Sequence, residues 1–377
     1  MNKNVLITGG AGFIGSNLAL KLVGQGYLVR VLDNLSPQIH GTEGDSPLYK
    51  SIKDKVEFIK GDVRKREDWI RALEGQDIVV HLAAETGTGQ SMYEVSRYFD
   101  VNVNGTAHLI DLLTNIKHSV QKMVIASSRA IYGEGKYACT THGIIYPLQR
   151  NEKDMLNGDF DCKCPICNQS VSILPTDETS AIHPTSYYGL TKQMQEQMIL
   201  LAGKTLGISS SALRFQNVYG PGQSLSNPYT GILAIFSNLI RNGQDINIFE
   251  DGAESRDFVF IDDVIDAIML TIESQQATGE VYNVGNGSSV TVTEVAEQLN
   301  TLYQQSVALN ISGNFRIGDI RHNVADISKI SRELGYKPKF SFEDGLCAFA
   351  AWVSSQEKFV SGYSASLQEM RNKGLLK

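Results

Sequence analysis

The chain has 377 residues, 42% of them hydrophobic and 20% charged, and its net charge is −7. This composition is typical of a globular protein with one large domain or two moderate ones, and the acidic balance argues against a nucleic-acid-binding surface. The sequence has no run of about 20 apolar residues that would span a membrane, and it enters a strand without a signal-peptide layout. We therefore expect a cytoplasmic protein with neither nucleic acid nor membrane as a partner.

The first 130 residues alternate short apolar strands with helical patterns. Strands are expected at 5–8, 28–32, 56–59, 78–82 and 123–126, and the clearest helices at 13–23 and 92–116. Apolar strands that alternate with helices predict a parallel sheet covered on both faces. With right-handed crossovers, this is a doubly wound, Rossmann-type α/β fold.

The alternating pattern breaks after residue 133. Glycines, prolines, charges and four cysteines fill 134–180, whereas a helix is expected at 185–206, a strand at 210–214 and a helix at 231–242. We therefore expect a first domain over 1–180 with a Cys-rich insertion at 134–176. Residues 181–206 would form a helix that returns to this domain. Residues 207–377 would form a smaller C-terminal α/β domain, with some segments returning to the sheet.

A glycine-rich loop joins the first expected strand to the first helix. Gly9 allows the tight turn, Gly12 lets the backbone approach a pyrophosphate, and Gly15 lets the helix pack closely on the sheet. Phe13 and Ile14 open the helix, whose free N–H groups face the phosphates. The strand–loop–helix context predicts a dinucleotide site rather than a turn without a ligand.

The ends of the next three strands supply further cofactor contacts. Asp33 can accept hydrogen bonds from ribose hydroxyls and would repel a 2′-phosphate, which favours NAD over NADP. Asp62 is placed to bond the adenine amino group, and His81 is expected to be a structural histidine. The cofactor-binding residues expected at these strand ends are Asp33, Asn34, Asp62, Val63, Leu82, Ala83 and Ala84.

Tyr188 and Lys192 lie four residues apart on the helix expected at 185–206, so their side chains share one face. An ammonium group beside a phenol lowers the phenol pKa from about 10. Such a tyrosine can take a proton from an alcohol or return it. Ser127 and Ser128 follow the strand at 123–126, where a hydroxyl can hold the substrate oxygen near the tyrosine.

These motifs together resemble the extended short-chain dehydrogenase/reductase family, and within it the nucleotide-sugar epimerases and dehydratases. The resemblance covers essentially the whole chain outside the insertion. It selects Ser128, four residues before the tyrosine of Tyr132-Gly133, as the catalytic serine beside Tyr188 and Lys192. It also implies that Asn102 supports the cofactor site and that Gln216 contacts the cofactor.

The resemblance makes the C-terminal domain the substrate-binding domain. The expected substrate contacts, besides Ser128 and Tyr188, are Asn217, Asn247, Phe249, Arg256 and Arg321. Asn217 would contact the phosphates, and Asn247 and Phe249 would lie near the base. Arg256 and Arg321 would grip the diphosphate, because a planar guanidinium bonds phosphate oxygens bidentately.

A mechanism follows from the resemblance. Tyr188 takes a proton from a sugar hydroxyl, expected at C4, while hydride passes to NAD. In an epimerase the keto sugar turns and takes hydride back on its other face. Family dehydratases carry an Asp-Glu pair where this chain has Arg129 and Ala130, so elimination of water is not expected. The alternatives are a 4-keto-sugar nucleotide reductase, a non-catalytic NAD-binding regulator and, against the acidic balance, a zinc-ribbon nucleic-acid module.

Cysteine is concentrated in the insertion. Cys139 and His142 form one pair and Cys164 and Cys167 another, each separated by two residues. This spacing lets a tight turn present two ligands to one tetrahedral ion. We expect a structural zinc site of these four residues, with Cys162 as a fifth candidate ligand; free cysteines in an irregular loop are the alternative.

Two residues near or beyond these pairs carry weaker expectations. Asn168 tolerates the left-handed conformation that a metal-binding turn often needs. Cys347 sits in an apolar helical stretch and is expected in the core.

The combination of Ser-Arg-Ala-Ile-Tyr-Gly, Cys-x-x-His-Gly, Cys-Pro-x-Cys and Gly-Asp-Ile-Arg-His resembles a subgroup described as dTDP-L-rhamnose 4-epimerases. It implies a dTDP- or UDP-linked hexose as substrate and a role in cell-surface polysaccharide biosynthesis. Family members usually dimerise through the helices equivalent to 92–116 and 185–206. We therefore expect a homodimer.

Overall fold

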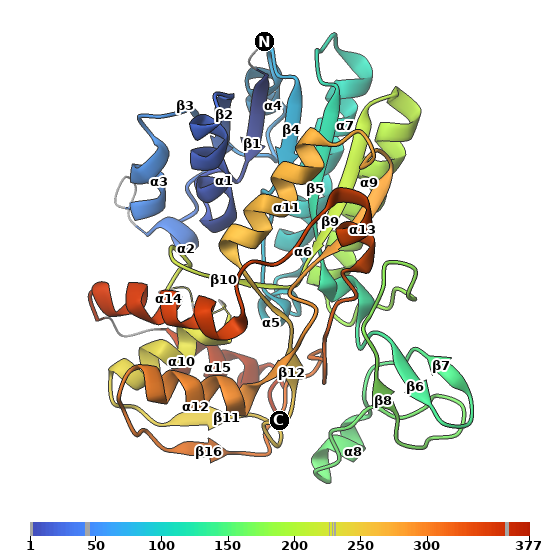
Figure 1. The fold of residues 1–377 in the computed structure, drawn as a ribbon, viewed down its shortest axis with the longest axis vertical. Coiled ribbons are helices and arrows are strands. Elements are labelled where there is room, and N and C mark those ends of the chain that lie inside the picture. The colour runs from blue at the N-terminus through green and yellow to red at the C-terminus, as the bar shows by residue number, and fades with distance from the viewer. Residues whose placement is uncertain (1–2, 42–45, 226, 228, 230, 359–361) are drawn as a thin grey trace.

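The computed structural model describes residues 3–41, 46–225, 227, 229, 231–358 and 362–377 (Figure 1). Over these residues the largest sheet is parallel and has the strand order β3-β2-β1-β4-β5-β9-β14. Its strands are β1 (Asn4–Thr8), β2 (Leu28–Asp33), β3 (Glu57–Lys60), β4 (Ile78–His81), β5 (Lys122–Ser128), β9 (Ser209–Phe215) and β14 (Glu280–Val284). This order is that of a doubly wound dinucleotide-binding sheet, so the expected Rossmann-type fold is confirmed.

The sheet is covered by helices on both faces because its strands carry apolar side chains on both sides. Val5 and Ile7 of β1 pack into one buried cluster, and Leu6 between them packs into another. The first cluster is closed by α1 (Phe13–Gly24) and α11 (Ile261–Glu273), which contact each other. The second is closed by α4 (Arg66–Leu73), α7 (Gly105–Asn115) and α9 (Tyr187–Leu206).

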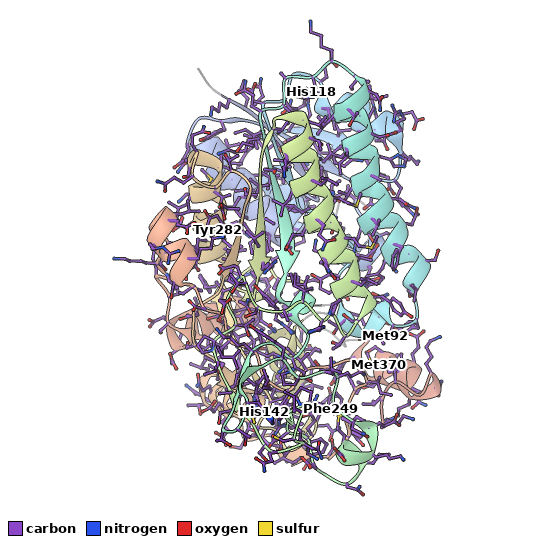
Figure 2. All side chains as sticks on the ribbon, turned by 90° about the vertical axis from the view of Figure 1, so that its right-hand side faces the viewer. Met92, His118, His142, Phe249, Tyr282 and Met370 are labelled. Atoms are coloured by element: carbon purple, nitrogen blue, oxygen red, sulfur yellow. The ribbon has the colours of Figure 1, made fainter. Side chains whose placement is uncertain are left out.

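Shorter helical segments connect the strands at the end of the sheet where the site lies. They are α2 (Pro37–His40), α3 (Pro47–Ile52), α5 (Thr88–Ser91) and α6 (Val95–Tyr98). The helix expected at 92–116 begins at Val95, and a π-helical stretch at Phe99–Asn104 joins α6 to α7. Figure 2 shows α7 and α9 side by side along the outer face of the upper part of the molecule.

The C-terminal half adds a second layer below the sheet in Figure 1. The helices of this layer are α10 (Ile232–Arg241), α12 (Val292–Leu302), α14 (Phe342–Ser355) and α15 (Tyr363–Asn372), whereas α13 (Ser328–Leu334) packs against β14 of the large sheet. Its short strands pair as β10 (Asn217–Tyr219) with β13 (Phe258–Phe260), β11 (Ile246–Ile248) with β16 (Leu309–Ile311), and β12 (Ser255–Arg256) with β15 (Val290–Thr291). Although β9 and β14 come after residue 207, both lie in the large sheet.

The Cys-rich insertion forms a small lobe beside the lower layer (Figure 1). It contains a three-stranded antiparallel sheet of β6 (Tyr137–Cys139), β7 (Gly143–Ile145) and β8 (Ser172–Ile173). The short helix α8 (Glu152–Leu156) lies between β7 and β8 in the chain. The insertion is therefore more regular than its sequence suggests. Its own buried cluster includes Tyr137, Ile145 and three of its cysteines.

Among the described helices, none combines the length and the apolar character that crossing a bilayer requires. The prediction that Cys347 lies in the core is wrong: it is exposed on α14. The buried stripe of α14 includes Leu346, Phe349, Ala350 and Val353, and Cys347 lies outside it.

Candidate active site

The loop between β1 and α1 requires glycine at two positions. Gly9 has φ +67°, and a Cβ at this residue would lie 2.8 Å from the backbone nitrogen of Ala83. A Cβ at Gly15 would lie 2.3 Å from the carbonyl oxygen of Gly9. The loop therefore brings β1, β4 and the start of α1 closer together than any side chain would allow.

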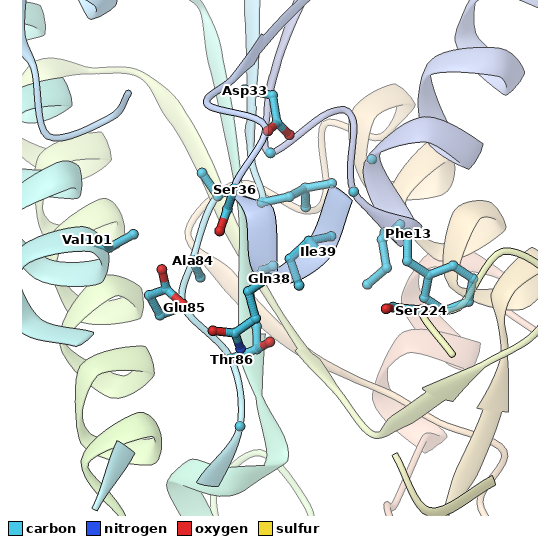
Figure 3. Close-up of a pocket in the computed structure, with 18 of the residues that line it drawn as sticks. Phe13, Asp33, Ser36, Gln38, Ile39, Ala84, Glu85, Thr86, Val101 and Ser224 are labelled. Atoms are coloured by element: carbon cyan, nitrogen blue, oxygen red, sulfur yellow. The ribbon is translucent and has the colours of Figure 1, made fainter. Parts of the chain in front are cut away.

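A pocket with a volume of about 430 Å³ opens above this loop, at the carboxyl ends of the parallel strands. Figure 3 shows Glu85 and Thr86 across the pocket from Phe13 and Ser224, with Asp33 at its far end. Fifteen of the residues expected at the site line it: Gly9, Gly12, Phe13, Ile14, Gly15, Asp33, Asn34, Val63, Leu82, Ala83, Ala84, Ser128, Tyr188, Lys192 and Gln216.

Asp33 ends β2 at this pocket. Its Oδ2 accepts a hydrogen bond from the Ala11 backbone (3.0 Å) and its Oδ1 accepts one from the Leu35 backbone (2.8 Å). The Nε2 of His40 lies 3.6 Å from the same Oδ1. Burial raises the pKa of Asp33, while these backbone bonds and His40 lower it. The carboxylate thus ties the glycine loop to α2.

Asp62 and Asn102 support the pocket wall instead of lining it. The carboxylate of Asp62 accepts hydrogen bonds from Arg64, at 3.0 Å from Nε and 2.7 Å from Nη2. Asn102 is fully buried and bonds both backbone groups of Glu85, at 2.8 and 3.1 Å, and the Thr191 hydroxyl at 3.0 Å. Asn102 therefore links the segment after β4 to α9.

The helix α9, which carries Tyr188 and Lys192, starts directly against the serine turn. Ser186 caps the helix by accepting a hydrogen bond from the Gly189 backbone at 3.1 Å. A Cβ at Gly189 would lie 2.4 Å from the carbonyl oxygen of Ala130. The Ser128 hydroxyl accepts a bond from the Ala130 backbone at 3.2 Å. This close packing brings the Tyr188 phenol within hydrogen-bond reach of Ser128.

The charges around Tyr188 differ from those the spacing predicts. Burial raises the pKa of Tyr188, whereas the hydrogen bond with Ser128 and the charge of Arg129 lower it. Burial also lowers the pKa of Lys192 to about 7, and its ammonium donates to the Oε1 of Gln195 at 2.8 Å. The pKa of Arg129 is lowered to about 10 by burial and by Arg256, so Arg129 stays cationic at neutral pH. Arg129 is thus the fixed positive charge beside the phenol.

Three arginines surround Asp319 next to this serine turn. Arg256 donates to Oδ1 of Asp319 at 3.1 Å, and Arg316 donates to Oδ2 at 2.6 Å. These charges and that of Arg129 lower the pKa of Asp319 despite the opposing effect of its burial. Arg129 also donates from Nε to the Oδ1 of Asn217 at 3.0 Å. The arginine cluster (Arg129, Arg256 and Arg316) thus lies beside Tyr188 and Asn217.

Arg321, expected in this cluster, is placed elsewhere by the structure. Its Nη groups bond both oxygens of Asp251, at 2.6 and 2.7 Å, and its Nε bonds Asp161 at 3.0 Å. Arg316, which no sequence motif singled out, lies in the arginine cluster instead. Its guanidinium lies 5.3 Å from the ring centroid of Phe249, and Asn247 lies on β11 just before that ring.

Some pocket residues carry no motif that would mark them in the sequence. Ser36, Gln38 and His40 come from the segment after β2, and Gln223 and Tyr229 come from the loop before α10. Only the fold brings these segments to one pocket.

The pocket fits a dinucleotide on an observation independent of the motif. The side-chain Oε1 atoms of Gln216 and Gln223 are buried and have no hydrogen-bond partner among the described residues. Both side chains line the pocket. A buried, unpaired amide oxygen is costly, so both atoms suit donors of a bound ligand.

The four expected metal ligands converge in the insertion. The Sγ atoms of Cys139 and Cys167 are 3.7 Å apart, and the Nδ1 of His142 lies 3.6 Å from Cys139 and 3.5 Å from Cys164. All four ligand atoms lie within 4.8 Å of one another. A tetrahedral ion with bond lengths of about 2.3 Å to sulfur and 2.0–2.1 Å to nitrogen would separate its ligands by roughly 3.5–3.8 Å. The four residues therefore form a candidate metal site.

Neighbouring residues agree with a metal-binding turn. Asn168 has φ +58°, as its position after Cys167 predicts, and its backbone bonds the carbonyl of Cys164 at 2.8 Å. Cys162 lies outside the group of four, with its thiol facing Tyr137 and Glu134. The geometry therefore favours the four residues Cys139, His142, Cys164 and Cys167 as the ligand set, without Cys162.

The fold and the pocket define a dinucleotide-dependent enzyme of the extended short-chain dehydrogenase/reductase type. The chain belongs to the NAD dependent epimerase/dehydratase family, whose model matches residues 5–151 and 165–285. The gap in the match falls within the Cys-rich insertion. The expectation of an NAD-dependent nucleotide-sugar epimerase is confirmed at the level of family and enzyme class.

Individual relatives are similar over nearly their whole length. The chain is 38% identical to a dTDP-L-rhamnose 4-epimerase of Burkholderia thailandensis over 358 residues, which cover 94% of this chain and 96% of that protein. A UDP-glucose 4-epimerase of Thermotoga maritima, solved with UDP-glucose, is 30% identical with a TM-score of 0.75, covering 93% of this chain and 98% of that one. A Bacillus cereus UDP-glucuronic acid 4-epimerase, solved with UDP-glucuronic acid and NAD, is 26% identical with a TM-score of 0.75, covering 93% and 99%.

Proposed function

We propose that the protein inverts C4 of a nucleoside-diphosphate sugar through a 4-keto intermediate, with Ser128, Tyr188 and Lys192 as its catalytic residues. The observation that carries this proposal is the position of the phenol. Tyr188 lies between the dinucleotide pocket and the arginine cluster, so one hydroxyl group reaches both the cofactor side and the diphosphate side of the site.

NAD would be held by the glycine loop at its phosphates, by Asp33 at a ribose, and by Gln216 and Lys192 near its reactive end. When bound, NAD accepts a hydride from the sugar carbon and returns it. The carboxylate of Asp33 would reject a 2′-phosphate, which favours NAD over NADP. Asn102, and Asp62 through its bonds to Asn34 and Arg64, would hold the surrounding backbone in place.

The catalytic residues of this chain handle one proton. The Tyr188 phenolate takes the C4 hydroxyl proton as hydride leaves C4, which gives a ketone, and Ser128 donates a hydrogen bond to the reacting oxygen. After the sugar has turned, hydride returns to the opposite face and Tyr188 gives the proton back. The positive charge of Arg129 stabilises the phenolate that exists before the proton is taken and again after it is given back.

Turning the sugar requires an anchor for the rest of the substrate. We assign the diphosphate to Arg256 and Arg316, with Asn217 beside them and with Asn247 and Phe249 toward the base. Arg316 replaces Arg321 in this role, because three carboxylates already engage the guanidinium of Arg321. No carboxylate occupies positions 129 and 130, so dehydration lacks its acid and base.

A dTDP-linked 6-deoxyhexose is the proposed substrate, by likeness to the Burkholderia thailandensis enzyme. The test incubates the purified protein with dTDP- and UDP-linked hexoses without added cofactor and follows C4 by proton NMR. Inversion at C4 with no net oxidation supports the proposal. Product that forms only when reduced nicotinamide is supplied stoichiometrically would indicate a reductase, and no conversion of any sugar would indicate a non-catalytic protein.

We further propose that the candidate metal site holds a structural zinc ion. Four N/S ligands complete a tetrahedron and leave no open position for chemistry, so the ion would stabilise the insertion. Metal analysis of the purified protein should give about one zinc per chain, and Cys164→Ser should abolish it. A protein that is folded and metal-free as purified would refute the zinc assignment.

A homodimer through α7 and α9 completes the proposal. The two helices lie side by side on one face (Figure 2), and Leu201 of α9 is 63% exposed there. Burying such a side chain between two copies would stabilise a dimer. Light scattering should give twice the chain mass, and Leu201→Glu should give the monomer, whereas Leu302→Glu on α12 should not. A monomeric wild-type protein would contradict this assignment.

A further inference from the structure

Arg150 belongs to the insertion, yet its guanidinium is buried against the C-terminal domain. Its Nε donates to Glu134 (3.1 Å), while Nη1 and Nη2 donate to the two oxygens of Glu250 (both 2.8 Å). The remaining donors reach the carbonyl oxygens of Phe160 (2.9 Å) and Asp319 (3.1 Å). All five N–H groups of a guanidinium are thus engaged. Arg150 acts as a fixed connection rather than a surface charge.

Glu250 is the residue that Arg150 holds. It has φ +50°, which a side chain other than glycine rarely adopts. It is 4% exposed, and Oε2 also accepts a bond from Nη1 of Arg321 at 3.0 Å. Arg321 in turn bonds Asp161 of the insertion. A strained backbone persists only where its surroundings fix it, and here two arginines fix it.

This connection leads directly to the proposed nucleotide wall, which we define as Phe249 and Arg316. Glu250 follows Phe249 in the chain. Arg150 also bonds the backbone carbonyl of Asp319, whose carboxylate bonds Arg316. A second contact joins the same parts: Phe160 of the insertion packs against Phe315 with ring centroids 6.4 Å apart. The insertion therefore contacts Glu250, next to Phe249 in the chain, and Phe315, next to Arg316 in the chain.

The candidate metal site closes the loop that makes these contacts. His142 and Cys164 bracket residues 143–163, and Arg150, Phe160 and Asp161 all lie in that interval. Figure 2 places His142 and Phe249 in the same lower part of the molecule. An ion that joins the two ends of a flexible loop removes much of its conformational freedom, so the ion would fix the direction from which Arg150 approaches.

We propose that the metal-closed insertion positions the nucleotide wall, with Arg150 as the positioning residue that transmits the constraint through Glu250. This inference rests on the proposed function, because it takes Phe249 and Arg316 to contact the nucleoside diphosphate. Nucleoside diphosphate affinity should then depend on the insertion, whereas NAD binding, at the other end of the site, should not.

The test measures dTDP and UDP binding by titration calorimetry on the full-length protein in its metal-bound form, together with NAD content. Arg150→Gln should raise the dissociation constant by on the order of tenfold or more and leave the NAD content unchanged. Lys153→Gln, which removes an exposed positive charge from α8 of the same insertion, is the matched control and should behave as wild type. Arg150→Lys keeps the charge but loses the bidentate bond, so its dissociation constant should lie between those of wild type and Arg150→Gln. If Arg150→Gln does not fold, Arg150→Lys serves as the test variant.

The metal arm uses the same readout. Removing the metal with a chelator should weaken dTDP or UDP binding to a similar degree, zinc should restore it, and Arg150→Gln should add little once the metal is gone. Wild-type affinity in folded Arg150→Gln or Arg150→Lys, or after metal removal, would overturn the inference. A wild-type protein that binds neither dTDP nor UDP would instead refute the proposed function.

Discussion

The Nε of Arg129 donates to the Oδ1 of Asn217 at 3.0 Å, and this bond ties the turn after Ser128 to the first residue of β10. The bond holds the cationic Arg129 beside Tyr188. The Tyr-x-x-x-Lys spacing predicts that Lys192 would supply this positive charge. Since burial lowers the pKa of Lys192 to about 7, only part of its population is charged at neutral pH. The pKa of Arg129 falls only to about 10, so Arg129 remains charged at neutral pH.

Replacing Arg129 should therefore move the pH dependence of the reaction. The phenolate is the active base, and the charge of Arg129 lowers the pKa of Tyr188. Without that charge the pKa rises, so in Arg129→Met the acidic limb of the kcat profile should shift to higher pH by about one unit. Arg129→Lys keeps the charge, so its pH profile should lie close to that of the wild type. A profile unchanged in Arg129→Met would show that Arg129 does not act on the phenol.

Lys192 should reduce stability in exchange for activity. Its pKa is about 7 in the folded state, below the value of about 10.4 of a free lysine. Between these pH values the unfolded chain binds more protons, so the free energy of unfolding should rise as pH increases from about 7 to 10. Lys192→Met should be more stable than wild type at pH 6 and lack this lysine-dependent rise, while losing activity. Denaturant unfolding at several pH values measures the stability at pH 6 and its rise with pH. A Lys192→Met variant that is less stable than wild type at pH 6 would contradict the lowered pKa of Lys192.

The glycine loop offers a matched pair of alanine substitutions within one helix. A Cβ at Gly15 would lie 2.3 Å from the Gly9 carbonyl oxygen, whereas a Cβ at Gly24 would meet nothing within 4 Å. Gly15→Ala should displace the loop and strongly reduce NAD binding. Gly24→Ala should leave it intact and raise stability slightly, by up to about 1 kcal/mol. NAD content measured after gentle purification separates the two, and equal content in both variants would show that the loop does not hold the cofactor.

The sequence predicted most reliably what depends on local geometry. The glycine loop, the alternation of strands and helices and the left-handed Asn168 follow from backbone constraints that act over a few residues. The four metal ligands share this property, since each pair lies within one turn, and the structure needs only to bring the two turns together. The boundaries shifted by a few residues because capping residues such as Ser186 set them.

The structure departs from the sequence-based expectations at residues whose surroundings depend on long-range contacts. Arg316 and Arg321 flank the same Gly318-Asp319, and nothing local distinguishes them. The structure separates them because carboxylates at 161, 250 and 251, distant in sequence, engage Arg321. Cys347 appeared buried because its neighbours are apolar, but only one side of α14 packs inward. The burial of Lys192 likewise depends on the sheet, and the spacing on its helix does not show it.

The most direct test of the account is C4 epimerisation by Tyr188→Phe, followed by NMR without added cofactor on a nucleotide sugar that the wild-type protein converts. The phenyl ring keeps the packing of the phenol and removes only its hydroxyl group, so the variant should fold and retain NAD. Its kcat should fall at least about 10²-fold, as expected when a general acid–base group is lost. Turnover at the wild-type rate in a folded, NAD-containing variant would contradict the role of Tyr188, on which the proposed mechanism depends.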